Sequence, residues 1–451
     1  MSAHPTDYVE LRARSAFSFL EGASEPEGLV ECAAAQGHRA LALADRFGVY
    51  GIPRFQRAAR SAGLRPIVGA RVALPGDFTP LLLVESRRGW QNLCRLLSLG
   101  HAGPQKGDFA LSWETFEEHA AGLTALVHAD ARLQRPDLDR GLAILGRERL
   151  WVDISRPRER EAAYESRRGA ALAEALGVPV LASGDVHFAR PEDRRLQDAL
   201  TCLRTGTHLE RAGRRLLANA ERHLHAPREM VRRFADRPEW IRATRRVAER
   251  CEFDLDDLGY RFPEFPVPGG DSQPSWLRAL SFEGARGRYG HPHSGRVRRQ
   301  LEHELALIEK LGLAGYFLIV HDIVRFARSQ GMLVQGRGSA ANSAVCYALG
   351  ITAVDPVGMD LLFERFLSEE RGEWPDIDLD LPSGERRESV IQYVFAKYGT
   401  RGAAMTANVI TYRTKLATRE MGKVLGHEGT LIDRLAALLA NLGDEREDPR
   451  N

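Results

Sequence analysis

The sequence contains little lysine and little cysteine. Only five of its 63 basic residues are lysine, so arginine carries almost all of the positive charge. The five cysteines are widely spaced and form no C-x-x-C pair, which favours reduced, mostly buried thiols over disulfides or a cysteine zinc site. No apolar run approaches the roughly 18 residues that span a bilayer, and the N-terminal stretch lacks the apolar core of a signal peptide. We therefore expect a cytoplasmic protein with no membrane partner.

The charge balance does not argue for a nucleic-acid partner. The formal net charge is only +2. Arginine forks onto phosphate oxygens, but an excess of Arg, Ala and Gly commonly reflects genomic base composition, and we prefer that interpretation. At 451 residues, the length suits about three domains of about 150 residues each.

Residues 8 to 190 alternate short apolar strands, such as "RALALAD", "PLLLVES" and "LWVDIS", with helical patterns. Repeated β-α units predict a largely parallel sheet, open or closed into a barrel. Polar residues gather where the strands end, which is the edge that carries the chemistry of α/β barrels; ordinary helix caps are the alternative. These residues are Asp45, Asp130, Asp153, Asp185 and His187.

The rest of the chain is mainly helical and contains one linker. Residues 251–274 are rich in Pro, Gly and Asp and read as a linker after an α/β part of residues 1–250. Residues 275–405 then carry helices, a short strand "MLVQ", the turn "GRGS", a small-residue helix "AANSAVCYALG" and a helix that Gly399 ends. Residues 406–451 follow as a further segment. A strand-like "AAMTANVITY" leads into it, and it holds two helices and a polar tail that we expect to fray.

An acidic strand, "PDIDLDL", is the strongest chemical signal. Alternate side chains of a strand share a face, so Asp376, Asp378 and Asp380 lie on one face. Each is about 7 Å from the next. Aspartate is a poor strand former, which favours a role as a hard-cation site. Two Mg²⁺ ions there could activate a 3′-hydroxyl and stabilise a leaving pyrophosphate. A solvated edge strand that uses charge against aggregation is the alternative.

A glycine-rich turn, "GRGSAANS", precedes the acidic strand by about 40 residues. It lies between a strand and a helix start, where free backbone N–H groups can hold phosphate oxygens. It does not match the P-loop pattern, and by itself it could be a tight turn. Together, the turn and the acidic strand predict a nucleotidyl-transfer site.

Several long motifs resemble one family. "GYFLIVHDIVRFARSQGMLVQGRGSAANSAVCYALGIT", "DPVGMDLLFERFL", "PDIDLDL" and "RRESVIQYVFAKYG" closely resemble the palm of bacterial C-family replicative polymerases, the DNA polymerase III α subunit. "TANVITYRTKLATREMGKVLG" and "YVELRARSAFSFLEGASEPEGLV" resemble the error-prone branch. The resemblance implies a PHP-type β/α barrel, an α+β nucleotidyltransferase-like palm and the start of a helical thumb. It also implies template-directed DNA synthesis linked to DNA damage, mutagenesis and translesion synthesis.

The resemblance also assigns site residues and ligands. Gly338 and Ser339 match the pair that positions the incoming triphosphate, and Arg337 is a candidate phosphate contact, with a surface arginine as the alternative. Asp376 and Asp378 match the two catalytic, metal-binding carboxylates of a two-Mg²⁺ site. The implied partners are DNA primer-template and deoxynucleoside triphosphates. In full-length relatives they include the sliding clamp and mutagenesis partners.

Asp380 is adjacent to this pair and is a less certain ligand. In the family, a third palm carboxylate lies on a later strand, and no "FDFLGL"-like segment occurs in this chain. Because positioning supplies most of phosphoryl-transfer catalysis, we expect that these 451 residues alone do not polymerise DNA.

The N-terminal barrel resembles a PHP (polymerase and histidinol phosphatase) domain with a damaged metal site. The family's H-x-H motif reads "ELRARS" here, its T-D-H motif reads "ADR", and an expected glutamate is Arg71. Only "GDVH", with Asp185 and His187, persists beside Asp45 and Glu10. Arginine cannot ligate a metal, so we expect guanidinium groups to pair with Glu10, Asp45 or Asp185 in a structural barrel that has lost its metals.

Two other functions remain open. One is a PHP-type metal-dependent phosphoesterase or 3′-5′ exonuclease, against which the arginine substitutions argue. The other is a non-catalytic module that binds DNA or polymerase partners.

Overall fold

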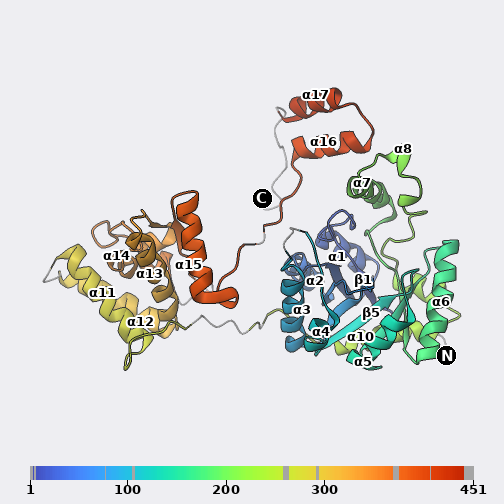
Figure 1. Cartoon of the computed structure of the whole chain (residues 1–451), viewed down its shortest axis with the longest axis horizontal. Helices are drawn as coiled ribbons and strands as arrows, with labels where there is room; N and C mark the ends of the chain where they lie inside the picture. The colour runs from blue at the N-terminus through green and yellow to red at the C-terminus, as the bar shows by residue number, and fades with distance from the viewer. Residues whose placement is uncertain are drawn as a thin grey trace. The chain divides into compact units, whose positions relative to one another are not determined.

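The computed structural model describes residues 4, 7–76, 78–103, 107–256, 258, 264–290, 294–368, 375–406 and 408–440. The chain divides into two compact units, which are described separately (Figure 1). The first comprises residues 1–258 together with 411–451, and the second comprises residues 259–410. Residues from Thr411 onward, which the sequence analysis set apart within a segment of residues 406–451, thus belong to the barrel unit. The expected polar tail at 443–451 lies outside the described residues.

The first unit is built on a seven-stranded sheet in which the strands follow chain order. All neighbours are parallel except β4, which is antiparallel to both β3 and β5. A parallel bridge between Ala13 and Val186 joins β1 to the segment after β7, so the sheet nearly closes on itself. The predicted α/β barrel is confirmed. Its strands are β1 (Glu10–Ala13), β2 (Ala40–Arg46), β3 (Arg65–Arg71), β4 (Leu81–Val84), β5 (Leu123–His128), β6 (Leu150–Ser155) and β7 (Val180–Ser183).

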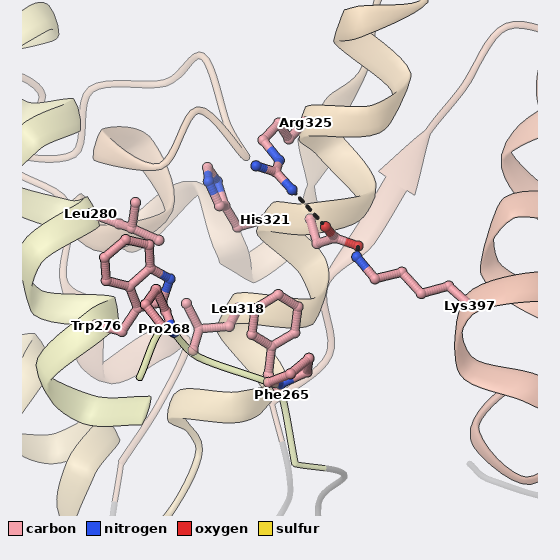
Figure 2. A pocket seen from close by; sticks show the side chains of 10 residues that line it. Phe265, Pro268, Trp276, Leu280, Leu318, His321, Arg325 and Lys397 are labelled. Atoms are coloured by element: carbon pink, nitrogen blue, oxygen red, sulfur yellow. Dashed lines mark hydrogen bonds and ion pairs between the residues drawn. The ribbon is translucent and has the colours of Figure 1, made fainter. Parts of the chain in front are cut away.

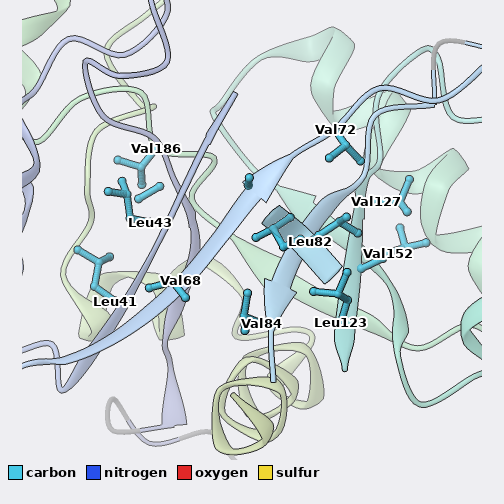
Figure 3. Packing of buried hydrophobic residues seen from close by; sticks show 14 of the residues in the cluster. Leu41, Leu43, Val68, Val72, Leu82, Val84, Leu123, Val127, Val152 and Val186 are labelled. Atoms are coloured by element: carbon cyan, nitrogen blue, oxygen red, sulfur yellow. The ribbon is translucent and has the colours of Figure 1, made fainter. Parts of the chain in front are cut away.

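Two apolar layers hold the sheet. In β2 every residue except Arg46 is buried, as in strands that are covered on both faces. Leu41 and Leu43 pack on one side, in the cluster of Figure 3. Ala42 and Ala44 alternate onto the other side, into a cluster that includes residues of α10 (Pro238–Arg250). Because the paired strands β1 to β3 and β5 to β7 run parallel, their polar C-terminal ends lie at one rim.

Helices cover the barrel, and the last two described helices also belong to this unit. Val424 of α16 is buried with Ala199 and Cys202 of α7. The helices are α1 (Pro26–Ala35), α2 (Ile52–Ser61), α3 (Arg87–Gly100), α4 (Trp113–Glu118), α5 (Arg135–Leu145), α6 (Arg160–Leu176), α7 (Arg194–Thr205), α8 (Leu209–Ala212), α9 (Pro227–Arg233), α10, α16 (Thr414–Val424) and α17 (Gly429–Ala440).

The second unit packs helices around a core that includes Phe317, Ile351 and Phe363. Its two short strands, β8 and β9, pair antiparallel. The regular part of α15 ends at Gly399, which adopts φ 66° as its predicted capping role requires. The elements are α11 (Gln273–Tyr289), α12 (Gly295–Lys310), α13 (Ala314–Ser329), β8 (Gln335–Arg337), α14 (Ala344–Ala348), β9 (Asp378–Asp380) and α15 (Glu385–Gly402).

Three expected elements differ in the structure. The strand expected at "MLVQ" begins later, at Gln335. The small-residue helix is split into a 3₁₀ turn (Gly338–Asn342) and α14, because extended Ser343 caps α14 by accepting from the Cys346 N–H. The expected strand "AAMTANVITY" is wrong for its described residues, which lie outside any strand. Its Ile410 is 88% exposed, whereas β-branched residues favour strands that have a surface to pack on.

Within the described residues, no helix is both long enough and apolar enough to cross a membrane.

Candidate functional site

The structure brings the glycine-rich turn against the acidic strand. In the ladder between β8 and β9, Arg337 lies opposite Asp378 and Gln335 lies opposite Asp380. Gly338, which begins the turn, has φ 71°, and a Cβ added there would lie 3.8 Å from Asp378 Oδ2. Two motifs about 40 residues apart in sequence therefore form one surface.

The aspartates of the acidic strand alternate as predicted. The three carboxylates are exposed, whereas the apolar residues between them are partly buried against the core of the second unit. The Ile377 N–H donates to the Tyr316 hydroxyl at 3.0 Å, which fixes the start of the strand. Burial raises the pKa of Tyr316 to about 12, and the negative charges of Asp376 and Asp378 add to that shift. Tyr316 thus stays protonated beneath the carboxylates.

Arg337 lies over two of these carboxylates. Its Nη2 is 3.6 Å from Asp378 Oδ2, and its Nε is 3.3 Å from Asp380 Oδ2. The three side chains are 50–63% exposed, and such surface ion pairs contribute at most about 1 kcal/mol. Arg337 therefore offsets the repulsion between the aspartates but is not locked onto them.

The carboxylates of this strand suit a Mg²⁺ site that water and phosphate complete, rather than a metal site made only of protein ligands. Within the part of the chain that the structure describes, no group of three or more His, Cys, Asp or Glu residues is arranged to hold a metal. Mg²⁺ commonly keeps several waters and binds through one or two carboxylates together with substrate phosphates. Exposed Asp378, which lies beside the glycine-rich turn, and exposed Asp376, two residues before it, are carboxylates of the kind that this ligand set uses.

A buried carboxylate fixes the other end of the turn. Glu304 of α12 accepts from the Ser343 hydroxyl at 2.8 Å and from the Ala344 and Val345 N–H groups at 2.9 and 3.0 Å. Gln300 Nε2 also donates to it at 2.9 Å, and burial raises the pKa of Glu304. The expectation that the amides at this helix start are free for phosphate is therefore wrong. A phosphate would have to approach the 3₁₀ turn instead.

A second buried carboxylate ties α15 to α13. Asp322 accepts from Lys397 Nζ at 2.6 Å and from the Tyr393 and Tyr398 hydroxyls at 2.7 and 2.9 Å. Figure 2 shows the adjoining cavity, of about 300 Å³, with Arg325 and Lys397 at its polar end. Because α15 directly follows the acidic strand, this network holds the element that leads away from the site.

In the barrel unit, arginines occupy the rim where the strands end. Arg12 donates to Asp153 at 2.8 Å, and His128 Nδ1 lies 2.7 Å from the other oxygen of Asp153. Arg14 and Arg222 both donate to Asp185. Although burial opposes ionisation, these two guanidinium groups hold the pKa of Asp185 well below its usual range.

Of the three carboxylates offered as arginine partners, Asp185 has that role, whereas Asp45 and Glu10 are held by other groups. Asp45 accepts from the N–H and hydroxyl of Ser15 and from the hydroxyl of Ser18, at 2.7 to 2.8 Å. Glu10 accepts from the Tyr8 hydroxyl and from the backbone N–H groups of Arg12 and Gly184. Neighbouring hydroxyl and backbone N–H groups donate to Asp45 and Glu10. Of the three predicted carboxylates, Asp185 is therefore the one that pairs with arginine.

The rim also contains three side chains that the sequence interpretation missed: Glu21, Arg222 and His128. Arg71 donates to Glu21. Arg222 donates to Asp185 from a segment whose sequence carries no pattern that relates it to the barrel strands. His128 ends β5 in the same way as the polar residues that were singled out, so a signal for it existed. His187 lies 3.5 Å from Asp185, but burial and Arg14 lower its pKa to about 3, so it is neutral near pH 7.

Comparisons with known proteins agree with this architecture. Residues 10–150 match the PHP domain family, and residues 275–448 match the family described as Bacterial DNA polymerase III alpha NTPase domain. The chain is thus similar in its two parts to domains of bacterial DNA polymerase III α. It is also similar over nearly its whole length to proteins named error-prone DNA polymerase. It is 42% identical over 445 residues to the error-prone DNA polymerase of Alkalilimnicola ehrlichii and 45% identical over 472 residues to that of Mycolicibacterium paratuberculosis.

These alignments cover 99% and 98% of this chain but only 43% of each relative, so the chain spans less than half of their length. Among solved structures, the lesion-specific endonuclease PfuEndoQ from Pyrococcus furiosus matches 40% of this chain and 48% of its own. The TM-score is 0.30 and the identity 12%. That likeness is too distant to bear on activity.

Proposed function

We propose that this chain supplies the nucleotide- and metal-binding surface of an error-prone DNA polymerase. Its substrates are a deoxynucleoside triphosphate and a DNA primer-template. The observation that carries the proposal is the pairing of β8 with β9, which sets Gly338 beside Asp378. The names of the error-prone relatives support the same activity.

Each residue has a distinct role in this proposal. Asp376 and Asp378 hold Mg²⁺ through exposed carboxylate oxygens. When bound, two such ions would activate the primer 3′-hydroxyl and stabilise the leaving pyrophosphate. The turn at Gly338 and Ser339 lets backbone approach the triphosphate, since Gly338 has no side chain and has a positive φ. Arg337 can exchange its weak pairs with the aspartates for the phosphates, which match its planar fork.

The barrel serves as a structural domain in this proposal. A phosphoesterase or exonuclease would need metal ligands where Arg12, Arg14 and Arg71 project, and guanidinium groups cannot ligate a metal. No specific observation favours a non-catalytic module over a polymerase surface. Damage-induced mutagenesis, translesion synthesis, a sliding clamp, mutagenesis partners and a cytoplasmic setting are further parts of the proposal that the error-prone relationship suggests.

Metal-dependent nucleotide binding tests the proposal. A deoxynucleoside triphosphate is titrated into the purified chain with and without Mg²⁺, and binding is followed calorimetrically. Asp376→Ala and Asp378→Ala should abolish the Mg²⁺-dependent component, whereas Asp360→Ala, at another exposed aspartate of the second unit, should leave it intact. Unchanged binding in both site variants would refute the assignment. Primer extension with the same variants reports separately whether the chain polymerises.

A further inference from the structure

A cavity of about 300 Å³ in the second unit is lined by residues of α11, α13 and α15 and by the segment before α11 (Figure 2). Its apolar wall comprises Phe265, Pro266, Pro268, Trp276, Leu280 and Leu318, and its polar end holds His321, Asp322, Arg325 and Lys397. We propose that this cavity binds a small aromatic carboxylate, with the ring against the apolar wall and the carboxylate at Arg325 and Lys397. The described residues that line it all lie outside the acidic strand and the glycine-rich turn, so this site is distinct from the nucleotide surface.

The polar end of the cavity carries an excess of positive charge. Although burial opposes its ionisation, Asp322 is charged, because hydrogen bonds from Lys397 and from two tyrosine hydroxyls lower its pKa. Lys397 and Arg325 both pair with this one carboxylate, at 2.6 and 3.2 Å. His321 adds no charge near pH 7, because burial lowers its pKa. Two cations and one carboxylate leave one positive charge, which the carboxylate of a ligand would neutralise.

The two cations are also accessible to a ligand. Arg325 donates to Asp322 through Nη2, but a guanidinium has five N–H groups, and the Arg325 side chain is 71% exposed. Lys397 Nζ lies 5.6 Å from the centre of the Phe265 ring, so the ammonium charge borders the apolar wall. A carboxylate at this end would accept charge-assisted hydrogen bonds, which are stronger than neutral ones.

The apolar wall favours an aromatic body for the ligand. Phe265, Trp276 and Leu280 are only partly buried, so each leaves apolar surface in contact with water. A ring that covers them removes this surface from water, and pairs of aromatic rings add favourable stacked or edge-to-face contacts. A volume of about 300 Å³ lies at the lower end of the range for small-molecule sites. The cavity therefore suits a ligand of one or two rings rather than a folded partner.

The test titrates 2-naphthylacetate into the whole chain at constant ionic strength and follows binding by ligand-observed NMR. Saturable binding is expected, with a dissociation constant of about 1 mM or below for a ligand of this size. The matched control ligand is 2-naphthylacetamide, which has the same shape but no charge. It should bind about tenfold more weakly, because its amide accepts no charge-assisted hydrogen bond.

Two variants separate the polar end from the apolar wall. Arg325→Gln should weaken binding of the acid by about tenfold and leave binding of the amide within about twofold of wild type. Trp276→Ala should weaken binding of both ligands by about tenfold, because both lose the aromatic contact. Arg298→Gln is the matched control, since Arg298 is an equally exposed arginine of the same unit that pairs with Glu302. It should leave both affinities within about twofold.

Circular dichroism checks that each variant is folded. Arg325→Gln leaves Asp322 its hydrogen bonds from Lys397 and from two tyrosine hydroxyls, so this variant should fold even if Trp276→Ala does not. Absence of saturable binding to the wild type, equal affinity for the acid and the amide, or acid binding that a folded Arg325→Gln or Trp276→Ala leaves unchanged would overturn the proposal.

Discussion

Glu21 is the carboxylate that connects three arginines of the barrel. Arg71 donates to it, Arg46 Nη1 lies 2.8 Å from Oε1, and Arg14 Nη1 lies 3.7 Å from Oε2. The side chain is only 13% exposed. Although burial opposes ionisation, Arg71 and Arg14 lower the pKa of Glu21 from 4.5 to about 2. Glu21→Gln would remove this charge while preserving the shape of the side chain.

The sign and size of the effect follow from linkage. A carboxylate with a depressed pKa in the folded state contributes stability above its unfolded pKa, and that stability is lost as the pH falls toward the folded value. At 1.36 kcal/mol per pKa unit, a shift from 4.5 to about 2 corresponds to about 3 kcal/mol. We therefore expect Glu21→Gln to lower the free energy of unfolding of the barrel unit by about 3 kcal/mol at pH 7. The difference from wild type should shrink between about pH 4.5 and pH 2.

Urea unfolding read by hydrogen exchange in peptides from β1 to β3 would report on the barrel unit alone. The matched control is Glu27→Gln, because Glu27 is 39% exposed and pairs with Arg54 at the surface, so less than about 1 kcal/mol should be lost. A loss below about 1 kcal/mol for Glu21→Gln at pH 7, or a deficit that stays constant as the pH falls, would refute the reasoning.

Three further predictions concern the second unit. Glu304→Gln should lower its stability by about 2 kcal/mol, because an amide N–H₂ group replaces one of the two oxygens that accept from buried donors at the start of α14; Glu302→Gln on the same helix, where the side chain is 41% exposed, is the control, and urea unfolding measures both. Lys397→Met should cost about 2 kcal/mol by leaving buried Asp322 without its ammonium partner, seen as faster hydrogen exchange in α15; unchanged exchange would contradict it. Gly338→Ala should cost about 1 kcal/mol, since φ is 71° there, and should weaken Mg²⁺-dependent nucleotide binding; calorimetry with full wild-type affinity would contradict the role of the turn.

The sequence predicts those features that depend on local periodicity. Alternation along the acidic strand identifies its faces correctly, because side chains of a strand must alternate. Gly399 ends the regular part of its helix for an equally local reason, its positive φ. The strand expected at "AAMTANVITY" fails because strand formation depends on a partner and a surface to pack on, which lie outside the segment itself.

Side chains that act over long sequence separations were beyond such reasoning. Arg222 reaches Asp185 from 37 residues away, and its own neighbourhood shows no periodic pattern that points to the barrel rim. Glu304 did leave a signal, because it occupies a core position between Leu301 and Ile308 in the apolar stripe of α12. A charged residue on a buried helix face requires a partner, and here that partner is the start of α14.

Arginine neutralises the carboxylates at both acidic sites of this chain, but the pairs are buried at one site and exposed at the other. We expect this difference in burial to decide which site can accept a metal. At the barrel rim, Asp185 is enclosed by Arg14 and Arg222, whose removal would leave a charge buried without a partner, at a cost of about 3–5 kcal/mol. At the acidic strand, Arg337 lies on Asp378 through an exposed pair that contributes at most about 1 kcal/mol. We therefore expect a divalent ion to displace Arg337 at little cost but not to displace Arg14 and Arg222. On this reasoning arginine excludes metals from the buried site and leaves the exposed site open to them, because the two sites differ in burial.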